Sequence, residues 1–364
     1  MKTEEVQTKI GGGRNTNLEL MRIVAMIIII AHHYVVNSGL IEMFDFSNIT
    51  ANMIFLQFAG FGDKMAINAF VLLSAYFMCT QKVTWRRVLK LVLEIYFYKI
   101  LIYSLFLLFG IDQLNLKSLY KTIFAPFYGF ERGFVGSFLA FYIMVPFLNI
   151  FVKAISQKTH KWLIASLLFL YTFISTFLLN TEAWSYLGWY ITLYFIASYL
   201  RFYPANILES KKVALGGLAT SVFLVFLSII LIDYIGPKIG FYDYYFFCAD
   251  SQKFLALTTG LFLFLTFKNI KIRQSRFINS LAMTTFGVLL IHANSDAMRN
   301  FLWRDLFDNV GYYTSELLPV HFLISVIVVY VVCAVIDYCR IRFIEKPLFQ
   351  KLDSIQFLRK ECFM

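Results

Sequence analysis

The chain has 364 residues and a formal net charge of +11, yet 59% of its residues are hydrophobic and only 15% are charged. Soluble domains carry about a quarter charged residues, so this composition excludes an ordinary soluble domain and indicates a multi-pass membrane protein. The lysines and arginines lie in short clusters between apolar segments, a pattern typical of membrane topology, so nucleic-acid binding is not expected.

Residues 1–15 mix acidic and basic side chains with the stretch "GGGRN", which predicts a flexible cytosolic tail rather than a signal peptide. Ten apolar segments follow, and we expect helices because open strands cannot satisfy their backbone groups in lipid. The segments are 19–38, 64–79, 89–109, 134–152, 162–179, 186–203, 213–234, 253–269, 278–293 and 317–339. The second and ninth are short for a crossing, which needs about 20 residues, and are expected to be tilted, re-entrant or extended by polar flanks.

The fold expected is therefore an all-α integral membrane protein, a bundle of about ten transmembrane helices within residues 16–347, followed by a cytosolic tail at 348–364. With the N-terminus inside, the inner connections hold 23 of the 33 lysines and arginines and the outer ones hold eight. This asymmetry predicts a cell-membrane protein with both termini in the cytosol. The outer connections 39–63, 110–133, 235–252 and 294–316 are the longer ones and are expected to shape a site.

Cysteines give no sign of a metal centre. The five of them form no CxxC motif and no cluster with histidine, so neither a zinc site nor a disulfide framework is indicated. No metal cofactor is expected.

Three ionisable side chains, Arg22, His32 and His33, interrupt the first apolar segment, "MRIVAMIIIIAHHYVV". Such groups are costly in a membrane and usually face the protein interior for a purpose. At about 100° per residue, His33 shares a helix face with Arg22, whereas His32 lies about 80° away. Glu19 falls near the same face and can pair with Arg22 at i, i+3.

His33 should lie about 16 Å deeper than Arg22, near the middle of the bilayer. An imidazole there suits a general base, because its ordinary pKa is near neutrality. The alternative is a buried histidine satisfied by a neighbour, with Arg22 extending to the membrane rim.

The stretch "NLELMRIVAMIIIIAHHY" resembles the opening of the membrane-bound acyltransferase-3 family, which includes bacterial O-acetyltransferases of surface glycans. That family has an arginine, ten intervening residues and a histidine in its first helix, and Arg22 and His33 fit this spacing. The stretch "INAFVLLSAYF" resembles the family's Phe-x-x-x-Ser-Gly element, with Ser74 aligned and Ala75 in place of glycine. In "WRRVLKL", Arg87-x-x-Lys90 stands where the family has Arg-x-x-Arg.

Later stretches carry the resemblance along nearly the whole chain. "FLAFYIMVPFLN" is similar to a family helix through Tyr142, Pro146 and Asn149. "FGVLLIHANSDAMRNFLW", with His292 and Asn294, and "IDYCRIRFIEKPLF" resemble family segments too.

The resemblance implies an O-acyltransferase that moves an acyl group, expected to be acetyl, from cytosolic acyl-CoA to a hydroxyl group. The acceptor would be a cell-surface or exopolysaccharide glycan or its lipid-linked precursor. His33 and Arg22 would be catalytic, His33 either deprotonating the acceptor or carrying the acyl group itself. Arg86, Arg87 and Lys90 would bind the CoA phosphates, although such a cluster is also an ordinary topology signal.

Seven further residues are expected to line the site: Glu19, Asn68, Ser74, Tyr142, Asn149, His292 and Asn294. Asn68 and Ser74 lie about 120° apart on a helix, and helix packing is the alternative for each. Tyr142 and Asn149 fit packing as well, and His292 with Asn294 fits either contact with an outer acceptor sugar or an interfacial cap.

Two other functions fit a polar stripe in a helical bundle. One is a multi-pass transporter or flippase of a glycan intermediate, for which related halves are typical but not visible here. The other is a membrane sensor or scaffold. The expected partners are acyl-CoA, a glycan or lipid-linked sugar, and membrane lipids.

Overall fold

The computed structural model describes residues 15–127, 133–178 and 185–363, and all regular secondary structure in these ranges is helical. The expected all-α fold is thus confirmed. The α-helices are α1 (Thr16–Val36), α2 (Ala51–Gly60), α3 (Asp63–Met78), α4 (Trp85–Leu108), α5 (Leu116–Ile123), α6 (Phe134–Ala154), α7 (Gln157–Leu168), α8 (Ile174–Phe177), α9 (Tyr186–Phe202), α10 (Lys211–Ile235), α11 (Phe254–Asn269), α12 (Arg276–Ala282), α13 (Thr285–His292), α14 (Asp296–Asn300), α15 (Leu318–Arg340), α16 (Lys346–Leu352) and α17 (Gln356–Arg359). Short 3-10 or π-helical turns are η1 (Leu40–Met43), η2 (Phe169–Phe173), η3 (Gly236–Ile239), η4 (Phe301–Leu306), η5 (Val310–Tyr312) and η6 (Ile341–Glu345).

The number of membrane-spanning helices differs from the ten expected. Among the described residues, six helical stretches are long and apolar enough to cross a membrane, or seven if one bent pair counts as a span. Those six correspond to α1, α4, α6, α7 with α8, α10, and α15 with α16. Of the other four expected segments, α3 and α11 have 16 residues, α9 has 17, and the ninth is broken. A bundle of ten full-length helices is therefore not confirmed.

The second expected segment is short because its helix is divided into α2 and α3. The helix is interrupted at Phe61 and Gly62, and α2 lies where the sequence predicted an outer loop. A Cβ on Gly62 would come within 2.2 Å of the Ile28 side chain. Glycine therefore lets this junction lie directly against α1.

The ninth expected segment is divided into α12 and α13 and then turns sharply. The helices over Arg276–His292 and Asp296–Tyr312 meet at 98°, the geometry of a broken span or a re-entrant loop. Ser295 starts α14 by accepting a hydrogen bond from the Met298 backbone, as capping serines do.

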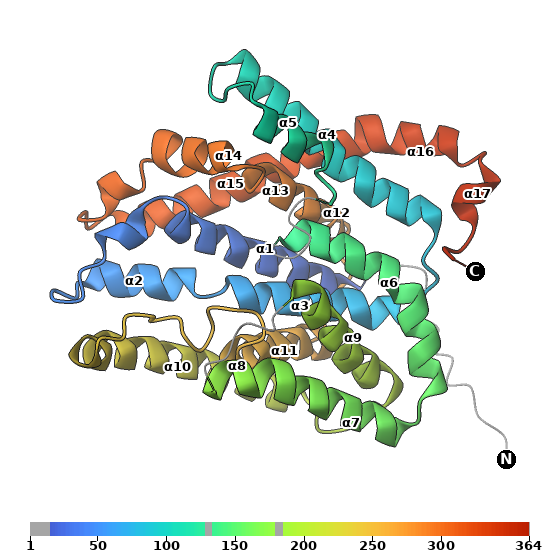
Figure 1. Cartoon of the computed structure of the whole chain (residues 1–364), viewed down its shortest axis with the longest axis horizontal. Helices are drawn as coiled ribbons and strands as arrows, with labels where there is room; N and C mark the ends of the chain where they lie inside the picture. The colour runs from blue at the N-terminus through green and yellow to red at the C-terminus, as the bar shows by residue number, and fades with distance from the viewer. Residues whose placement is uncertain (1–14, 128–132, 179–184, 364) are drawn as a thin grey trace.

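Helix α1 runs through the middle of the bundle, where it contacts α3, α11, α13 and α15 (Figure 1). A helix that is apolar on all sides is expected to be buried, and Met21, Ala25 and Ile30 have no exposed surface. This central position surrounds the histidines of α1 with other helices.

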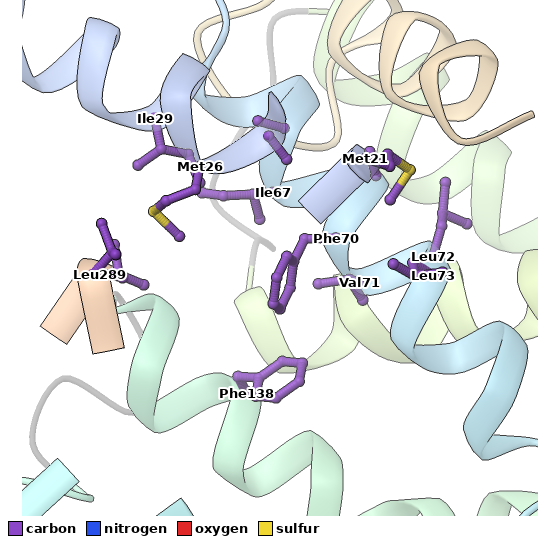
Figure 2. Close-up of a cluster of buried hydrophobic side chains, with 14 of the residues drawn as sticks. Met21, Met26, Ile29, Ile67, Phe70, Val71, Leu72, Leu73, Phe138 and Leu289 are labelled. Atoms are coloured by element: carbon purple, nitrogen blue, oxygen red, sulfur yellow. The ribbon is translucent and has the colours of Figure 1, made fainter. Parts of the chain in front are cut away.

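A hydrophobic cluster joins α1 to three neighbouring helices. Figure 2 shows Met26 and Ile29 of α1 near Ile67 and Phe70 of α3, with Leu289 of α13 beside them. Phe138 of α6 completes the cluster, its ring centre 6.2 Å from that of Phe70. The cluster lies directly beneath the candidate site.

Helices α4 and α15 are tied together by a buried ionic network around Arg340. Its guanidinium donates to Asp337 at 2.6 Å, Glu345 at 2.8 Å and Glu94 at 2.9 Å. Tyr98 of α4 also donates to Asp337, at 2.7 Å. These bonds fix the rotation of α4 and thereby the direction of the neighbouring Lys99.

The C-terminal segment packs against the start of α4. Cys362 donates its backbone N–H to the Val83 carbonyl at 2.8 Å, and Trp85 stacks on Phe357 with ring centres 5.7 Å apart. The start of α1 and helix α17 lie at the same end of the bundle (Figure 1). The segment predicted as a tail at 348–364 is folded onto the bundle over its described part.

Candidate functional site

Two histidines from distant parts of the chain meet at the centre of the candidate site. His33 lies in the last turn of α1, and its Nδ1 is 3.0 Å from Nε2 of His292, the last residue of α13. The Nδ1 of His292 is 2.6 Å from the Val288 carbonyl oxygen one turn earlier. His292 is fully buried, whereas His33 is half-buried and lines a cavity.

The hydrogen-bond chain assigns the tautomers of the two imidazoles. A carbonyl oxygen only accepts, so Nδ1 of His292 carries a hydrogen and donates to Val288. With both rings neutral, Nε2 of His292 is then an acceptor, and His33 donates from Nδ1. The lone pair of His33 is therefore on Nε2, the nitrogen that a general base or nucleophile would use.

A cavity of about 360 Å³ opens beside His33. Helices α1, α3, α4 and α13 supply most of its walls, and the starts of α6 and α9 close it. His33 lies near the end of α1, and Asp63, Phe134 and Tyr186 begin their helices, whereas Met26 and Lys99 lie in the middle parts of α1 and α4. The cavity thus extends from the end of α1 toward the middle of the bundle.

The cavity has an apolar inner part and a polar outer part. We call the inner part the apolar floor: Met26, Ile29, Ile67, Phe70, Ile95 and Leu289. We call the outer part the polar rim: His33, Asp63, Lys64, Lys99, Lys121, Tyr186, Asn294 and Arg299. Met26 and His33 are seven residues apart on one helix, so the floor extends about 10 Å below the histidine.

Asp63 organises one side of the polar rim. Its carboxylate lies 3.0 Å from the Lys64 ammonium and 3.9 Å from Nε2 of His32. Lys64 also donates to the Tyr186 hydroxyl at 3.3 Å. His32 is held from its other side, since its Nδ1 is 2.5 Å from the Gly60 carbonyl oxygen. The two adjacent histidines thus have different partners.

Lys99 and Asn294 form the opposite side of the polar rim. The Lys99 ammonium donates to the Asn294 backbone carbonyl at 2.6 Å, and the Asn294 amide donates to the Leu290 carbonyl at 2.9 Å. A second cavity of about 160 Å³ shares Lys99, Lys121 and Asn294 with the first. The two cavities therefore adjoin at these residues.

Arg22 lies beneath the apolar floor rather than in the cavity. It is one helical turn before Met26, and its guanidinium carbon is 5.8 Å from the centre of the Phe70 ring, which itself lines the cavity. Glu19 is buried in the first turn of α1. The pairing of Glu19 with Arg22, and a catalytic role for Arg22, stay predictions.

The residues expected to bind CoA lie toward the other end of α4. All three have partners within the chain: Arg86 pairs with Asp353 at 2.7 Å, Arg87 donates to Gln81 at 3.0 Å, and Lys90 pairs with Glu345 at 2.6 Å. Lys90 precedes Lys99 by nine residues, about 13 Å along the helix. The basic cluster is thus separate from the polar rim, and its role toward CoA stays a prediction.

Four of the expected lining residues make packing contacts instead of lining the cavity. Asn68 donates to the Ser251 carbonyl at 2.7 Å and accepts from Trp189 Nε1 at 2.8 Å, and Ser74 donates to the Phe70 carbonyl at 2.9 Å. Asn149 donates to the Met78 carbonyl at 3.1 Å and accepts from the Tyr194 hydroxyl at 2.6 Å. Tyr142 packs on Phe138 with ring centres 6.5 Å apart. The packing alternative describes their positions. Asn294 does line the cavity, and His292 lies directly behind His33.

Sequence reasoning did not assign Asp63, Lys64, Lys99, Lys121 or Tyr186 to a site. Lys99 carried a signal, because it is a lysine inside an apolar segment. Asp63 and Lys64 stand together at the start of the second segment, where they read as ordinary loop charges. Within the described ranges, no group of three or more His, Cys, Asp or Glu side chains is suited to hold a metal ion.

Comparison with known proteins identifies the family. A family model described as an acyltransferase domain matches residues 15–338, nearly the whole chain. No curated protein and no solved structure matches it. The matched range includes the histidine pair, both sides of the polar rim and the apolar floor. Together with its several apolar helices, the match shows that the chain belongs to the acyltransferase-3 family of membrane acyltransferases.

Proposed function

We propose that this protein transfers an acyl group, expected to be acetyl, from cytosolic acyl-CoA to a hydroxyl of a cell-surface glycan or its lipid-linked precursor. One observation carries the proposal: His33, with Nε2 as its basic nitrogen, lies at the boundary between an apolar floor and a polar rim. An acyl thioester suits the floor and a sugar suits the rim. Their reacting groups would meet at the histidine.

The reaction is a general-base acyl transfer. Nε2 of His33 takes the proton of the acceptor hydroxyl as its oxygen attacks the thioester carbonyl. The tetrahedral intermediate then collapses, the carbon–sulfur bond breaks, and the imidazolium returns the proton to the departing CoA thiolate. His292 keeps accepting the Nδ1 hydrogen of His33 throughout, which holds the ring in the required tautomer as third groups do in catalytic triads.

CoA would approach from the end of the bundle where α1 begins. Arg86 and Lys90 border a small cavity of about 160 Å³ there, and their side chains suit phosphate groups. The nucleotide would stay at this end while its flexible pantetheine arm brings the thioester to the apolar floor. Arg22, stacked beneath Phe70, lies along this route.

The acceptor would enter from the opposite end through the two adjoining cavities at Lys99 and Asn294. Delivery of acyl groups across the membrane needs both ends of the bundle to be accessible from different compartments. A cell-membrane location with cytosolic termini meets this need, and the charge asymmetry of the connections supports it.

The proposal is tested by mass spectrometry of surface glycans from cells that express the wild type, His33→Ala or His33→Gln at equal levels. Both variants are expected to reduce glycan acylation by at least about a hundredfold, because they remove the general base. His32→Gln is the matched control and should retain acylation, since its side chain bonds Gly60 and Asp63 rather than His292. Undiminished acylation in both His33 variants would overturn the proposed chemistry.

A further inference from the structure

The polar rim is rich in cationic side chains. We call the cavity of about 360 Å³ beside His33 the inner cavity and the adjoining one of about 160 Å³ the outer cavity. Among the described residues that line the inner cavity, Lys64, Lys99, Lys121 and Arg299 are cationic, and Asp63 is the sole carboxylate. Asp63 pairs with Lys64. Lys99, Lys121 and Arg299 therefore share this cavity with no further carboxylate among its described lining residues.

Among these cations, Lys99 gives the strongest indication of an anion-binding site. It lies within the apolar helix α4, and its ammonium bonds a neutral carbonyl, that of Asn294, at 2.6 Å. In the described part of the chain no carboxylate forms an ion pair with it. A charged group in such surroundings is costly, and an anion bound in the cavity would offset that cost.

Arg299 of α14 provides an independent indication. Its Nη1 pairs with Asp296 at 2.9 Å, but its Nε is buried and has no hydrogen-bond partner among the described residues. A buried donor without an acceptor costs free energy. Because Arg299 lines the cavity, a ligand oxygen there can accept this hydrogen bond.

The carboxylates are distributed unevenly between the two adjoining cavities. Asp112 and Asp296 line the outer cavity, whereas neither lines the inner one. An anion entering through the outer cavity would therefore be favoured most strongly beside Lys99 and Arg299. His33 lines the same cavity as these two cations.

We propose that the polar rim binds an anionic group, a carboxylate or a phosphate, carried by the acceptor next to the hydroxyl that is acylated. This inference rests on the proposed function for the identity of the ligand as an acceptor. The phosphates of CoA are a poorer match, because the apolar floor separates the rim from the end where the basic cluster of α4 lies. The acceptor class is thus an acidic or phosphorylated sugar.

Binding is measured with the full-length protein in lipid nanodiscs, by the rise in its unfolding temperature with ligand concentration. Three probes separate the chemistry: methyl glucuronoside for the carboxylate, glucose 6-phosphate for the phosphate, and methyl glucoside as the neutral sugar. We expect one or both anionic sugars to stabilise the protein more than the neutral one. The stronger of the two anionic probes identifies the source of the negative charge.

Variants of the polar rim test whether its cations bind the anionic probe. Lys99→Gln and Arg299→Gln are each expected to weaken binding of the anionic probe by about tenfold, the loss of one charged hydrogen bond. Lys99→Arg keeps the charge and should retain binding, which guards against a folding defect. Arg304→Gln is the matched control, because Arg304 is exposed, is paired with Glu42 at 4.0 Å and lies outside both cavities.

The proposal is overturned if the neutral sugar binds as well as the anionic ones, or if Lys99→Gln and Arg299→Gln bind the anions normally. An equal loss in Arg304→Gln would also overturn it, since the effect would then be a general surface potential. The assay needs no acyl transfer. Selective anion binding without any glycan acylation in cells would contradict the proposed function alone.

Discussion

His292 acts on the candidate base without lining the cavity. It accepts the Nδ1 hydrogen of His33 and is itself fixed by the Val288 carbonyl. Removing the acceptor with His292→Leu should lower kcat by roughly ten- to a hundredfold, with little change in KM, because the base loses its preferred tautomer and orientation. Steady-state kinetics with acyl-CoA and the purified protein measures this split.

The conservative variant separates positioning from a structural role. The amide oxygen of His292→Gln can accept the His33 hydrogen, so this variant should recover much of the lost kcat. The unfolding temperatures of both variants show whether they fold. If folded His292→Gln is no faster than His292→Leu, or if the leucine variant changes only KM, His292 does not orient the base.

The sequence identified one partner of this pair more firmly than the other. The eleven-residue spacing from Arg22 singled out His33, since a helix turns a fixed angle per residue. His292 was expected to reach an outer sugar or to form an interfacial cap, and the structure places it behind His33 instead. Packing of α13 on α1 decides this contact across 259 residues, and no local periodicity encodes such a distance. The same holds for Lys99, whose position was visible but whose direction depends on the Arg340 network.

At the scale of elements, each of the ten apolar segments contains a helix, but hydropathy missed α2 and did not locate the breaks within the segments. The break between α2 and α3 depends on Gly62, which lies against Ile28. In α13, a Cβ on Gly287 would come within 2.2 Å of the Asp337 carboxylate, so close packing on α15 requires glycine there. These contacts join distant segments, which explains why an apolar stretch alone did not predict whether its helix would be continuous.

The C-terminal segment gives an element-scale prediction. Asp353 holds Arg86 through two hydrogen bonds at 2.7 and 3.3 Å, and Glu361 pairs with Lys82 at 2.9 Å. We expect Asp353→Asn to loosen the segment and to speed tryptic cleavage at Arg359, because a charge-assisted contact is lost. Cleavage rates at pH 8 measure the change. Glu316→Gln, an exposed carboxylate elsewhere, is the control, and equal rates in all three proteins would contradict the docking.

Acidification should release the same contact. The hydrogen bond from Arg86 lowers the pKa of Asp353 below its ordinary value. A carboxylate with a depressed folded-state pKa stabilises the docked segment above its unfolded pKa, and this stabilisation is lost as the pH falls through the lower folded-state value. The protection factors of the backbone amides at 354–362 against hydrogen exchange should therefore fall at acidic pH in the wild type more than in Asp353→Asn. The same pH response in both would show that Asp353 is not the responsible group.

At the scale of the whole molecule, the candidate site and the basic cluster lie in different parts of the bundle. The polar rim lies where α1 ends and α3 begins, whereas Arg86 and Lys90 lie at the start of α4 beside the C-terminal segment. The apolar floor and the Phe70 ring separate the two. The proposed transfer across a membrane would require the polar rim and the basic cluster to be accessible from opposite compartments.

Cysteine labelling tests this orientation. Cys339 is exposed and the other four cysteines are buried. The Cys339→Ser variant should therefore react little with maleimide, and single exposed cysteines can be introduced into it. Asn48→Cys, on the exposed connection between α1 and α2, should react with a membrane-impermeant maleimide in intact cells. Ser354→Cys, exposed between α16 and α17, should react only after the membrane is permeabilised, because the charge asymmetry predicts that both termini are cytosolic. The reverse pattern would put the polar rim on the cytosolic side, where an acceptor outside the cell could not reach His33.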